Sequence, residues 1–271
     1  MATRVAIQGY KGCFHEQAAR LFYADVIPVE CDTFEQLYQA LDEGRADAAV
    51  MAIENTVSGG LLHNFELLRQ KGRRVKGEVY IRIGQNLMAL PGQRLEDLRE
   101  VRTHYMAINQ TRPWFEQNAP WIRLTESDDT AKSAAQLALA GEKGVGAVAS
   151  ELAARLYGLE ILAPGIETHK QNFTRFLILD ESLEVTSPDK ALLCFTLPHK
   201  PGSLAQILTI LSFYEMNLTR IQSLPISGRE WQYFFYVDIK FADYVRYTQA
   251  LQAVRPLLED LEVLGEYKAA L

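Results

Sequence analysis

Short apolar runs alternate with helical patterns through the first 180 residues. Residues 4–8, 46–53 and 173–179 are apolar runs with the length of buried strands. Residues 15–23 place apolar side chains at helical spacing between the first two of these runs. Strands that alternate with helices indicate βαβ units and a largely parallel sheet.

Polar or glycine-rich turns follow several of the predicted strands. Gly9, Glu54, Thr130 and Ser150 stand at or just beyond such strand ends. Parallel α/β sheets bind ligands outside the carboxyl ends of their strands. We therefore expect these turns to face one cleft.

The pattern changes after Asp180. Residues 183–189 are polar and contain Pro188, which is typical of a linker. From Lys190 onward the pattern predicts strand, helix, strand, hairpin strand, helix and strand, with the hairpin turn at Ser227-Gly228. This order is the βαββαβ unit of ferredoxin-like domains. We expect one domain over 1–182, with a second subdomain over roughly 76–165, and another domain over 190–271.

The composition is that of a globular protein, with 48% hydrophobic and 23% charged residues among 271. No apolar stretch approaches the ~20 residues that span a bilayer. The apolar run after Arg4 is far too short for a signal-peptide core. We expect a cytoplasmic protein without a membrane segment.

The net charge of −6 is spread over 34 acidic and 28 basic residues without a block of one sign. Nucleic acid binding needs a concentrated basic face, so no nucleic acid partner is expected. A small anionic substrate would need local cations or backbone donors to overcome the net charge.

The common cofactor and metal motifs are absent. The turn at Gly9–Gly12 lacks the third glycine of a dinucleotide site and the Lys-Ser/Thr pair of a P-loop. There is no GxSxG or HExxH segment, and the five histidines have no ligand-like spacing. Cys13, Cys31 and Cys194 form no CxxC pair, which favours reduced, buried thiols. We expect no cofactor and no metal.

Several short clusters, weak alone, together resemble the prephenate dehydratase family across residues 5–180. The most specific is Asn172, Thr174, Arg175 and Phe176, which match its Asn-x-Thr-Arg-Phe signature. The remaining matches are to its opening glycine-rich motif, its Ile-Glu-Asn-Ser segment, its His-Pro-Gln-Ala-Leu region, its Thr-Ala helix start and its Ser-Glu-x-Ala-Ala-x-x-Tyr-Gly-Leu run: Gly9, Gly12, Phe14, Glu16, Ala18, Ala19, Glu54, Asn55, Gly60, His104, Ala107, Thr130, Ala131, Ser150, Glu151, Ala153, Ala154, Tyr157, Gly158 and Leu159.

The resemblance implies an α/β catalytic domain of two subdomains around a cleft, like type-2 periplasmic binding proteins. It implies a lyase that converts prephenate to phenylpyruvate with loss of CO2 and water in L-phenylalanine biosynthesis. Thr174 would be the catalytic hydroxyl and Arg175 a partner of a substrate carboxylate. Five further residues would line the pocket: Asn55, Thr56, Thr130, Asn172 and Phe176.

Three positions in this region have a plain structural explanation beside the functional one. Glu54 is as well explained by a helix cap or an ion pair as by a role in the site. His104 is better explained as a hydrogen-bonded structural imidazole than as an acid or base. Cys13 stands where the family has serine or threonine, and a thiol is a weaker donor.

Residues 190–271 resemble an ACT domain, which binds amino acids at a dimer interface. Matching positions are Pro201, Gly202, Ser203 and Leu204 in the glycine turn, Asn217 and Leu218 before the next strand, and Ser223 within it. Gln222 and Leu224 replace the charged residues of the family's Glu-Ser-Arg-Pro segment. The resemblance implies phenylalanine feedback in a homodimer or homotetramer, although a domain that only holds a dimer together would also fit.

Two other functions stay open. Arogenate dehydratases act on a substrate that differs from prephenate by one amino group, and no residue here separates the two. A non-catalytic binding protein of the periplasmic type is disfavoured by the complete Asn-x-Thr-Arg-Phe segment.

Overall fold

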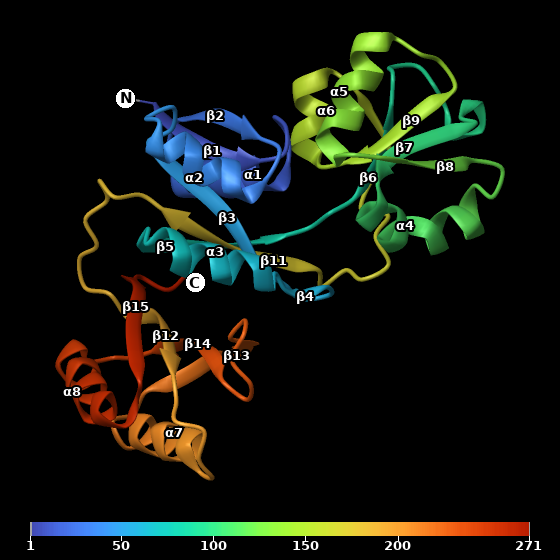
Figure 1. Cartoon of the computed structure of the whole chain (residues 1–271). Coiled ribbons are helices and arrows are strands. Elements are labelled where there is room, and N and C mark those ends of the chain that lie inside the picture. Colours follow the sequence, from blue (N-terminus) through green and yellow to red (C-terminus); the bar gives the residue numbers. More distant parts are fainter. Residues whose placement is uncertain (1, 271) are drawn as a thin grey trace. The chain divides into compact units, whose positions relative to one another are not determined.

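The computed structural model describes residues 2–270, which form two compact units. The first unit comprises the residues up to Gly60 together with Val79–Phe176. The second comprises Leu61–Glu78 and the residues from Leu177 onward. Figure 1 labels the elements along the chain.

The first unit contains two α/β lobes. In the first lobe, β1 pairs in parallel with β2 on one side and β3 on the other, and β11 follows β3 in the sheet. Val5, Ala6 and Ile7 have no exposed surface, as expected for a strand covered on both faces. The elements of this lobe are β1 (Thr3–Gln8), α1 (Phe14–Phe22), β2 (Val26–Cys31), α2 (Phe34–Asp42), β3 (Ala48–Asn55), β4 (Gly59–Gly60) and β11 (Phe173–Leu179).

The second lobe has its own sheet, in the order β10-β6-β9-β7-β8. β7 is parallel to β8 and β9, whereas β6 is antiparallel to β9 and β10. The expected largely parallel sheet is therefore mixed in this lobe. Its elements are β6 (Asn86–Ala89), a 3₁₀ turn (Leu95–Asp97), β7 (Glu100–His104), α4 (Tyr105–Asn118), β8 (Arg123–Ser127), α5 (Thr130–Ala140), β9 (Val145–Ala149), α6 (Glu151–Tyr157) and β10 (Glu160–Ala163).

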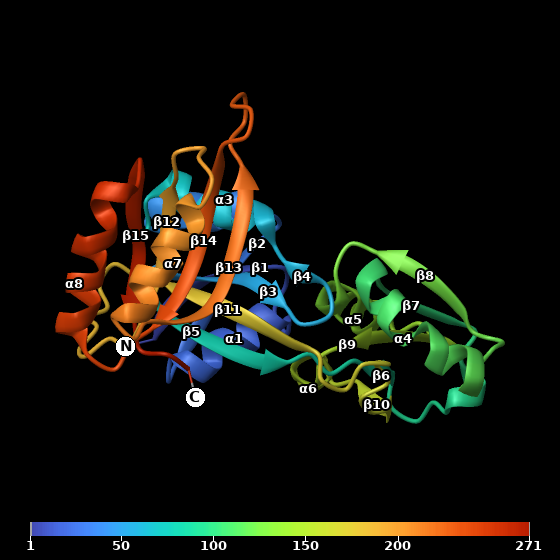
Figure 2. The same ribbon diagram turned by 90° about the horizontal axis from the view of Figure 1, so that it is seen from below.

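The second unit is built on a βαββαβ module with strand order β13-β14-β12-β15, the ferredoxin-like arrangement predicted from the pattern. Both helices cover one face of its sheet (Figure 2). The elements are α3 (Leu62–Lys71), β5 (Val75–Arg82), β12 (Lys190–Thr196), α7 (Ser203–Phe213), β13 (Asn217–Pro225), β14 (Tyr233–Lys240), α8 (Tyr244–Val254), a 3₁₀ turn (Arg255–Leu257) and β15 (Asp260–Tyr267).

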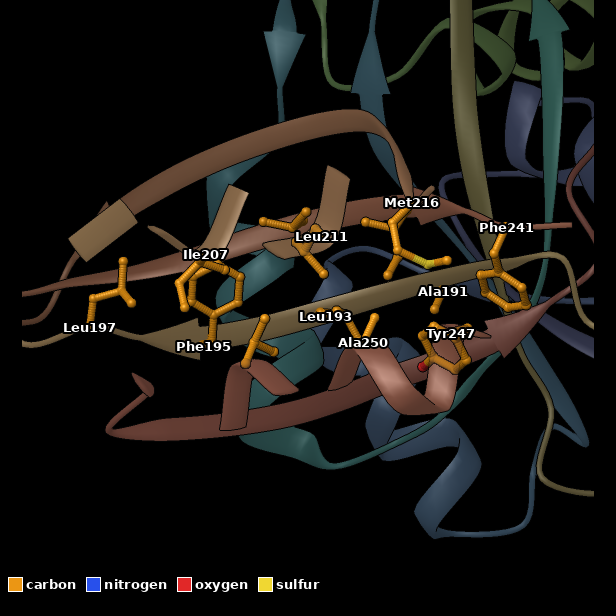
Figure 3. Packing of buried hydrophobic residues seen from close by; sticks show 13 residues of the cluster. Ala191, Leu193, Phe195, Leu197, Ile207, Leu211, Met216, Phe241, Tyr247 and Ala250 are labelled. Atoms are coloured by element: carbon orange, nitrogen blue, oxygen red, sulfur yellow. The ribbon is translucent and has the colours of Figure 1, made fainter. Parts of the chain in front are cut away.

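The module's core follows from strand alternation. Leu193 and Phe195 of β12 point toward Ile207 and Leu211 of α7, and Tyr247 of α8 packs on the same face (Figure 3). The buried apolar side chains of this cluster exclude water from one face of the sheet, which leaves the other face for a second layer.

Helix α3 contacts that other face. The ring of Phe65 lies 5.1 Å from that of Tyr236, and the guanidinium of Arg69 lies 4.0 Å from the ring centre of Phe234. Lys190 and Glu78 form a buried ion pair, with Nζ 2.9 Å from both carboxylate oxygens. The compact units therefore do not coincide with the expected domains 1–182 and 190–271, because α3 and the start of β5 pack with the C-terminal module.

Candidate active site

The hydroxyl of Thr174 lies beside the side chain of Asn55. Thr174 belongs to β11, and Asn55 is the last residue of the neighbouring strand β3. The Asn55 amide nitrogen donates to Thr174 Oγ1 at 2.9 Å and to Asn172 Oδ1 at 2.6 Å. Only 8% of Thr174 is exposed. The fold thus gathers three of the expected site residues from two distant segments.

The orientation of the Asn55 amide is set by the backbone. Its oxygen accepts hydrogen bonds from the N–H groups of Val57 at 2.9 Å and Ser58 at 2.8 Å. The amide NH2 must therefore face Thr174. Because Thr174 Oγ1 accepts this bond, the hydroxyl hydrogen of Thr174 is left to be donated elsewhere.

Asn172 adds a second donor close by. Its side chain is 1% exposed, and its Nδ2 group has no hydrogen-bond partner within residues 2–270. A buried N–H2 group without an acceptor is uncommon in folded proteins and is expected to have a function or a ligand. Asn172 and Thr174 are thus linked through the Asn55 amide nitrogen, which donates to an oxygen of each.

Thr56 uses its hydroxyl to hold the start of β11. Its Oγ1 donates to the carbonyl of Gln171 and accepts from the N–H of Phe173, both at 2.9 Å. The backbone N–H of Thr56 also donates to the Phe173 carbonyl. The structure therefore places Thr56 in a supporting position under the loop that precedes Thr174.

Arg175 and Phe176 follow Thr174 in the same strand and are both buried, at 2% and 1% exposed. Alternation along β11 turns Arg175 to the face opposite Thr174 and Phe176. The Arg175 guanidinium lies 5.9 Å from the ring centre of Tyr80, and the Phe176 ring packs edge-on against His15.

Thr130 begins α5, and Asp129 caps that helix by accepting from the N–H of Lys132 at 2.8 Å. Burial raises the pKa of the Asp129 carboxyl. Gly9 lies directly against it, since a Cβ atom on Gly9 would stand 2.9 Å from Asp129 Oδ2. The strand-end turns at Gly9 and Thr130, which were expected to face each other, are therefore neighbours.

Gly12 of the first lobe and Ser150 of the second lobe are in contact. Ser150 Oγ donates to the carbonyl of Gly12, and the Tyr157 hydroxyl donates to the carbonyl of Lys11 at 2.8 Å. A Cβ atom on Gly12 would stand 2.8 Å from the Cα of Ala153, so only glycine permits this approach. The Ser-Glu-x-Ala-Ala run thus serves as a contact between the lobes.

Cys13 and His104 occupy structural positions. Cys13 is buried, its thiol lies 3.6 Å from the Gln8 carbonyl, and burial raises its pKa far above the ordinary thiol value, which makes it unreactive. His104 Nδ1 accepts from the N–H of Met106 at 3.3 Å and so caps α4. Glu54 lies in β3, where its backbone is in register with that of Gly60 in the antiparallel strand β4.

His15 is a residue near the site that the motif comparison did not single out. It is buried between Phe34 and Phe176, and its Nε2 accepts from the N–H of Ala52 at 3.4 Å. Burial lowers its pKa from 6.5 to about 3, so the ring is neutral. A histidine among apolar residues at helical spacing could have indicated such a core position.

Neither a metal centre nor a membrane helix is found in the described residues. Residues 2–270 contain no group of three or more His, Cys, Asp or Glu side chains arranged to hold a metal ion. None of the helices within the same range has the length and apolar character needed to cross a bilayer.

The C-terminal positions separate into two places. Gly202 has φ +83° and precedes α7, whereas Ser203 and Leu204 line a cavity of about 130 Å³ together with Trp231. Ser223 is level with Phe195, near the strand end that leads into Pro201 and this turn. Asn217 is level with Lys190, and Leu218 follows it, at the opposite end of the sheet. One chain therefore cannot bring Gly202 and Asn217 to one small ligand.

The sequence is similar to those of known dehydratases. A family model described as prephenate dehydratase matches residues 5–183. The bifunctional chorismate mutase/prephenate dehydratase of Aquifex aeolicus is 35% identical over 99% of this chain and 74% of its own length. Arogenate dehydratase 2 of Petunia hybrida is 34% identical over 97% of this chain and 71% of its own length.

Solved structures share the whole fold. The prephenate dehydratase of Arthrobacter aurescens in complex with L-Phe superposes with a TM-score of 0.84 at 29% identity, covering 98% of this chain and 89% of that one. A protein described as GqqA, a novel type of quorum quenching acylase, gives 0.88 at 31% identity, covering 98% of both chains.

Proposed function

Because the chain belongs to the prephenate dehydratase family, we propose that it converts prephenate to phenylpyruvate with loss of carbon dioxide and water, using Thr174 as the group that assists the departing hydroxyl. The observation that carries the proposal is the hydrogen bond from Asn55 to Thr174 Oγ1, which directs the threonine proton outward.

The reaction suits a neutral donor. Prephenate carries a doubly allylic hydroxyl and a ring carboxylate, and losing both makes the ring aromatic. As the C–C bond to the carboxylate breaks, its electron pair enters the ring, and the C–O bond breaks to release the hydroxyl oxygen. A hydrogen bond from Thr174 to that oxygen strengthens as its negative charge grows, which lowers the barrier. The departing hydroxide becomes water by taking a proton from solvent.

Asn55 supports Thr174 in this role. Its N–H donates to the threonine oxygen, so partial negative charge on that oxygen is stabilised while the hydroxyl hydrogen is drawn toward the substrate. We propose that the Asn172 N–H2 group, which has no acceptor among residues 2–270, donates to a substrate oxygen. We propose that Thr56 and Thr130 shape the pocket, that Phe176 supports it from the core, and that Arg175 binds a substrate carboxylate.

Arogenate is the second candidate substrate, since a relative of similar identity is an arogenate dehydratase. The two substrates differ only in an amino group in place of the side-chain keto oxygen. Comparing kcat/KM for prephenate and arogenate on the same preparation decides between them.

We propose that L-phenylalanine regulates the enzyme through the ferredoxin-like module, acting as an ACT domain. A structurally similar prephenate dehydratase is in complex with L-Phe. Since Gly202 and Asn217 lie at opposite ends of the sheet in one chain, a shared ligand requires two copies, which agrees with a homodimer or homotetramer. Gln222 and Leu224 flank Ser223 in β13 and would set the selectivity.

The direct test is to incubate the purified chain with prephenate and to follow phenylpyruvate by its absorbance in alkali. Phenylpyruvate formation above the uncatalysed rate supports the proposal. Binding of prephenate without turnover would assign the chain instead to the non-catalytic binding proteins.

A further inference from the structure

A cavity of about 550 Å³ lies in the second unit and shares no lining residue with the cavity at the Gly202 turn. Its size is within the range of small-molecule sites in proteins. Its walls come from the start of β5, the connection before β12, the start of α8 and the end of β15. The lining residues are Arg74, Val75, Lys76, Val185, Pro188, Tyr244, Val263, Gly265 and Glu266.

The backbone around Gly265 accounts for the position of the cavity. The pairing of β15 with β12 shifts between Val263 and Gly265, which makes Leu264 an extra, bulged residue. Gly265 pairs with Val75 of β5, and a Cβ atom on Gly265 would overlap the Val75 carbonyl oxygen. Bulges commonly redirect side chains beside functional sites. Here the bulge lies between two lining residues, Val263 and Glu266.

The charges that line the cavity are of both signs. Arg74 and Lys76 are two residues apart in the extended backbone at the start of β5, so their side chains point to the same face of the strand. Neither side chain has an ion-pair partner in the described part of the chain. Glu266 accepts a hydrogen bond from the Tyr244 hydroxyl at 3.1 Å and has no cation paired with it among residues 2–270.

The apolar wall comes from the connection and from β15. Val185 and Pro188 are half-buried, as is Val263, and Tyr244 adds an aromatic ring. A ligand that fits these groups needs a carboxylate, a cation and an apolar body. A simple anion would be repelled by Glu266, and a simple amine would be repelled by Arg74 and Lys76.

We propose that this cavity binds a free aromatic amino acid, phenylalanine or tyrosine. Its carboxylate pairs with Arg74 and Lys76, and its ammonium pairs with Glu266. Its ring lies against Val185 and Val263. The site shares no residue with the Gly202 turn, and its occupation does not depend on dehydratase activity.

Isothermal titration of the full-length chain with L-phenylalanine and, separately, L-tyrosine tests the proposal. The number of sites per chain should fall by one in Val185→Trp, which fills the cavity from the connecting segment. This drop is expected whatever the Gly202 turn binds. The amino acid that loses a site identifies the ligand, and an unchanged number of sites for both would overturn the proposal.

Charge variants test the proposed contacts of the ligand's ammonium and of its carboxylate one at a time. Glu266→Gln should weaken binding of the amino acid at this site by about tenfold or more, yet should not weaken 3-phenylpropionate, which lacks the ammonium. Lys76→Met should weaken the same amino acid and 3-phenylpropionate alike. Lys71→Met, an exposed cation at the end of α3, is the matched control and should leave both unchanged. Equal effects of Lys76→Met and Lys71→Met would also refute the site.

Discussion

The Asn55 amide nitrogen donates to the hydroxyl oxygen of Thr174 at 2.9 Å, while the Asn55 oxygen is held by two backbone N–H groups. This arrangement gives the threonine hydroxyl one direction, because its oxygen is occupied as an acceptor and its hydrogen is not. A side chain with no acidity near neutral pH thereby becomes a fixed donor, which is what a departing hydroxide requires.

Two substitutions of Thr174 test the contribution of its hydroxyl apart from that of its methyl group. Thr174→Val keeps the shape and removes the donor, so kcat should fall by about 10²–10³-fold, the usual loss for one transition-state donor. Thr174→Ser keeps the donor and should retain much of the activity. Steady-state kinetics with prephenate measures both, and an unchanged kcat in Thr174→Val would exclude the role.

The coupling of Asn55 to Thr174 can be measured in the same assay. Asn55→Asp replaces the donor with an acceptor, which would draw the Thr174 hydrogen away from the substrate and lower kcat. If the two residues act as one unit, kcat of the double variant Asn55→Asp/Thr174→Val should lie within a few fold of kcat of Thr174→Val. Fully additive losses would mean that Asn55 acts independently of Thr174.

Gly12 should matter for activity through the approach of the two lobes. In Gly12→Ala the new Cβ would meet the backbone of Ala153 at 2.8 Å, so the contact between Gly12 and Ser150 must open. We expect kcat/KM to fall by roughly tenfold or more. Gly44→Ala is the matched control, because Gly44 also has positive φ (+67°) but no atom within 4 Å of the added Cβ. It should cost about 1 kcal/mol of stability and leave the kinetics intact.

Arg175 can be tested for the proposed carboxylate role. Arg175→Lys keeps a charge and loses the planar fork that grips two carboxylate oxygens, so KM for prephenate should rise while kcat changes less. The buried position beside Tyr80 offers the competing explanation. A fall in melting temperature with KM unchanged would assign Arg175 to packing of β11 alone.

The local pattern was sufficient to predict elements whose apolar residues are contiguous. The strands predicted at residues 4–8 and 46–53 correspond to β1 and β3, and the βαββαβ order after Lys190 was correct. Around Gly84 the chain leaves β5 and enters β6, which belong to different sheets. Nothing in a run of apolar residues shows where the chain passes from one sheet to another.

Two elements contain a proline. Helix α4 begins at Tyr105 and carries Pro113 inside, and the strand β2 contains Pro28. A proline only excludes a helix or a sheet interior when its missing N–H was needed, and that depends on neighbours that local sequence does not show.

The site itself came from motif resemblance and not from local pattern. Asn55 and Thr174 are 119 positions apart, and their pairing depends on β3 and β11 being neighbours in the sheet. Strand alternation could have indicated that Arg175 faces away from Thr174. The packing of α3 on the C-terminal module involves residues such as Phe65 and Tyr236, whose association no local signal predicts.

His15 should make stability depend on pH. Its pKa is lowered to about 3 in the folded chain by burial, against 6.5 when unfolded, so the unfolded chain takes up the proton first. The contribution of the neutral His15 ring to the free energy of unfolding is complete above pH 6.5 and is lost progressively as the pH falls toward 3. The free energy of unfolding can be measured by urea unfolding at several pH values. It should depend less steeply on pH in His15→Gln, which keeps an acceptor for the N–H of Ala52. The control His169→Gln changes an exposed histidine and should show the same pH dependence of the free energy of unfolding as the parent protein.

The buried pair of Lys190 and Glu78 should be costly to break from one side only. Both side chains are almost fully buried, at 4% and 1% exposed, and Glu78 also accepts from the N–H of Ala270 at 3.1 Å. Lys190→Met removes the ammonium that lies 2.9 Å from both Glu78 carboxylate oxygens and should lower the free energy of unfolding by about 3–5 kcal/mol.

Removing the partner should rescue most of that loss. The double variant Lys190→Met/Glu78→Leu removes both charges from an apolar environment and should be much closer to the parent than Lys190→Met is, because the desolvation cost of each ion disappears with it. Arg4→Met is the control, since Arg4 and Asp47 form an ion pair that is 44% exposed on both sides and should contribute below about 1 kcal/mol. A double variant as unstable as Lys190→Met would show that the methylene packing of these side chains, and not their charge, stabilises the unit.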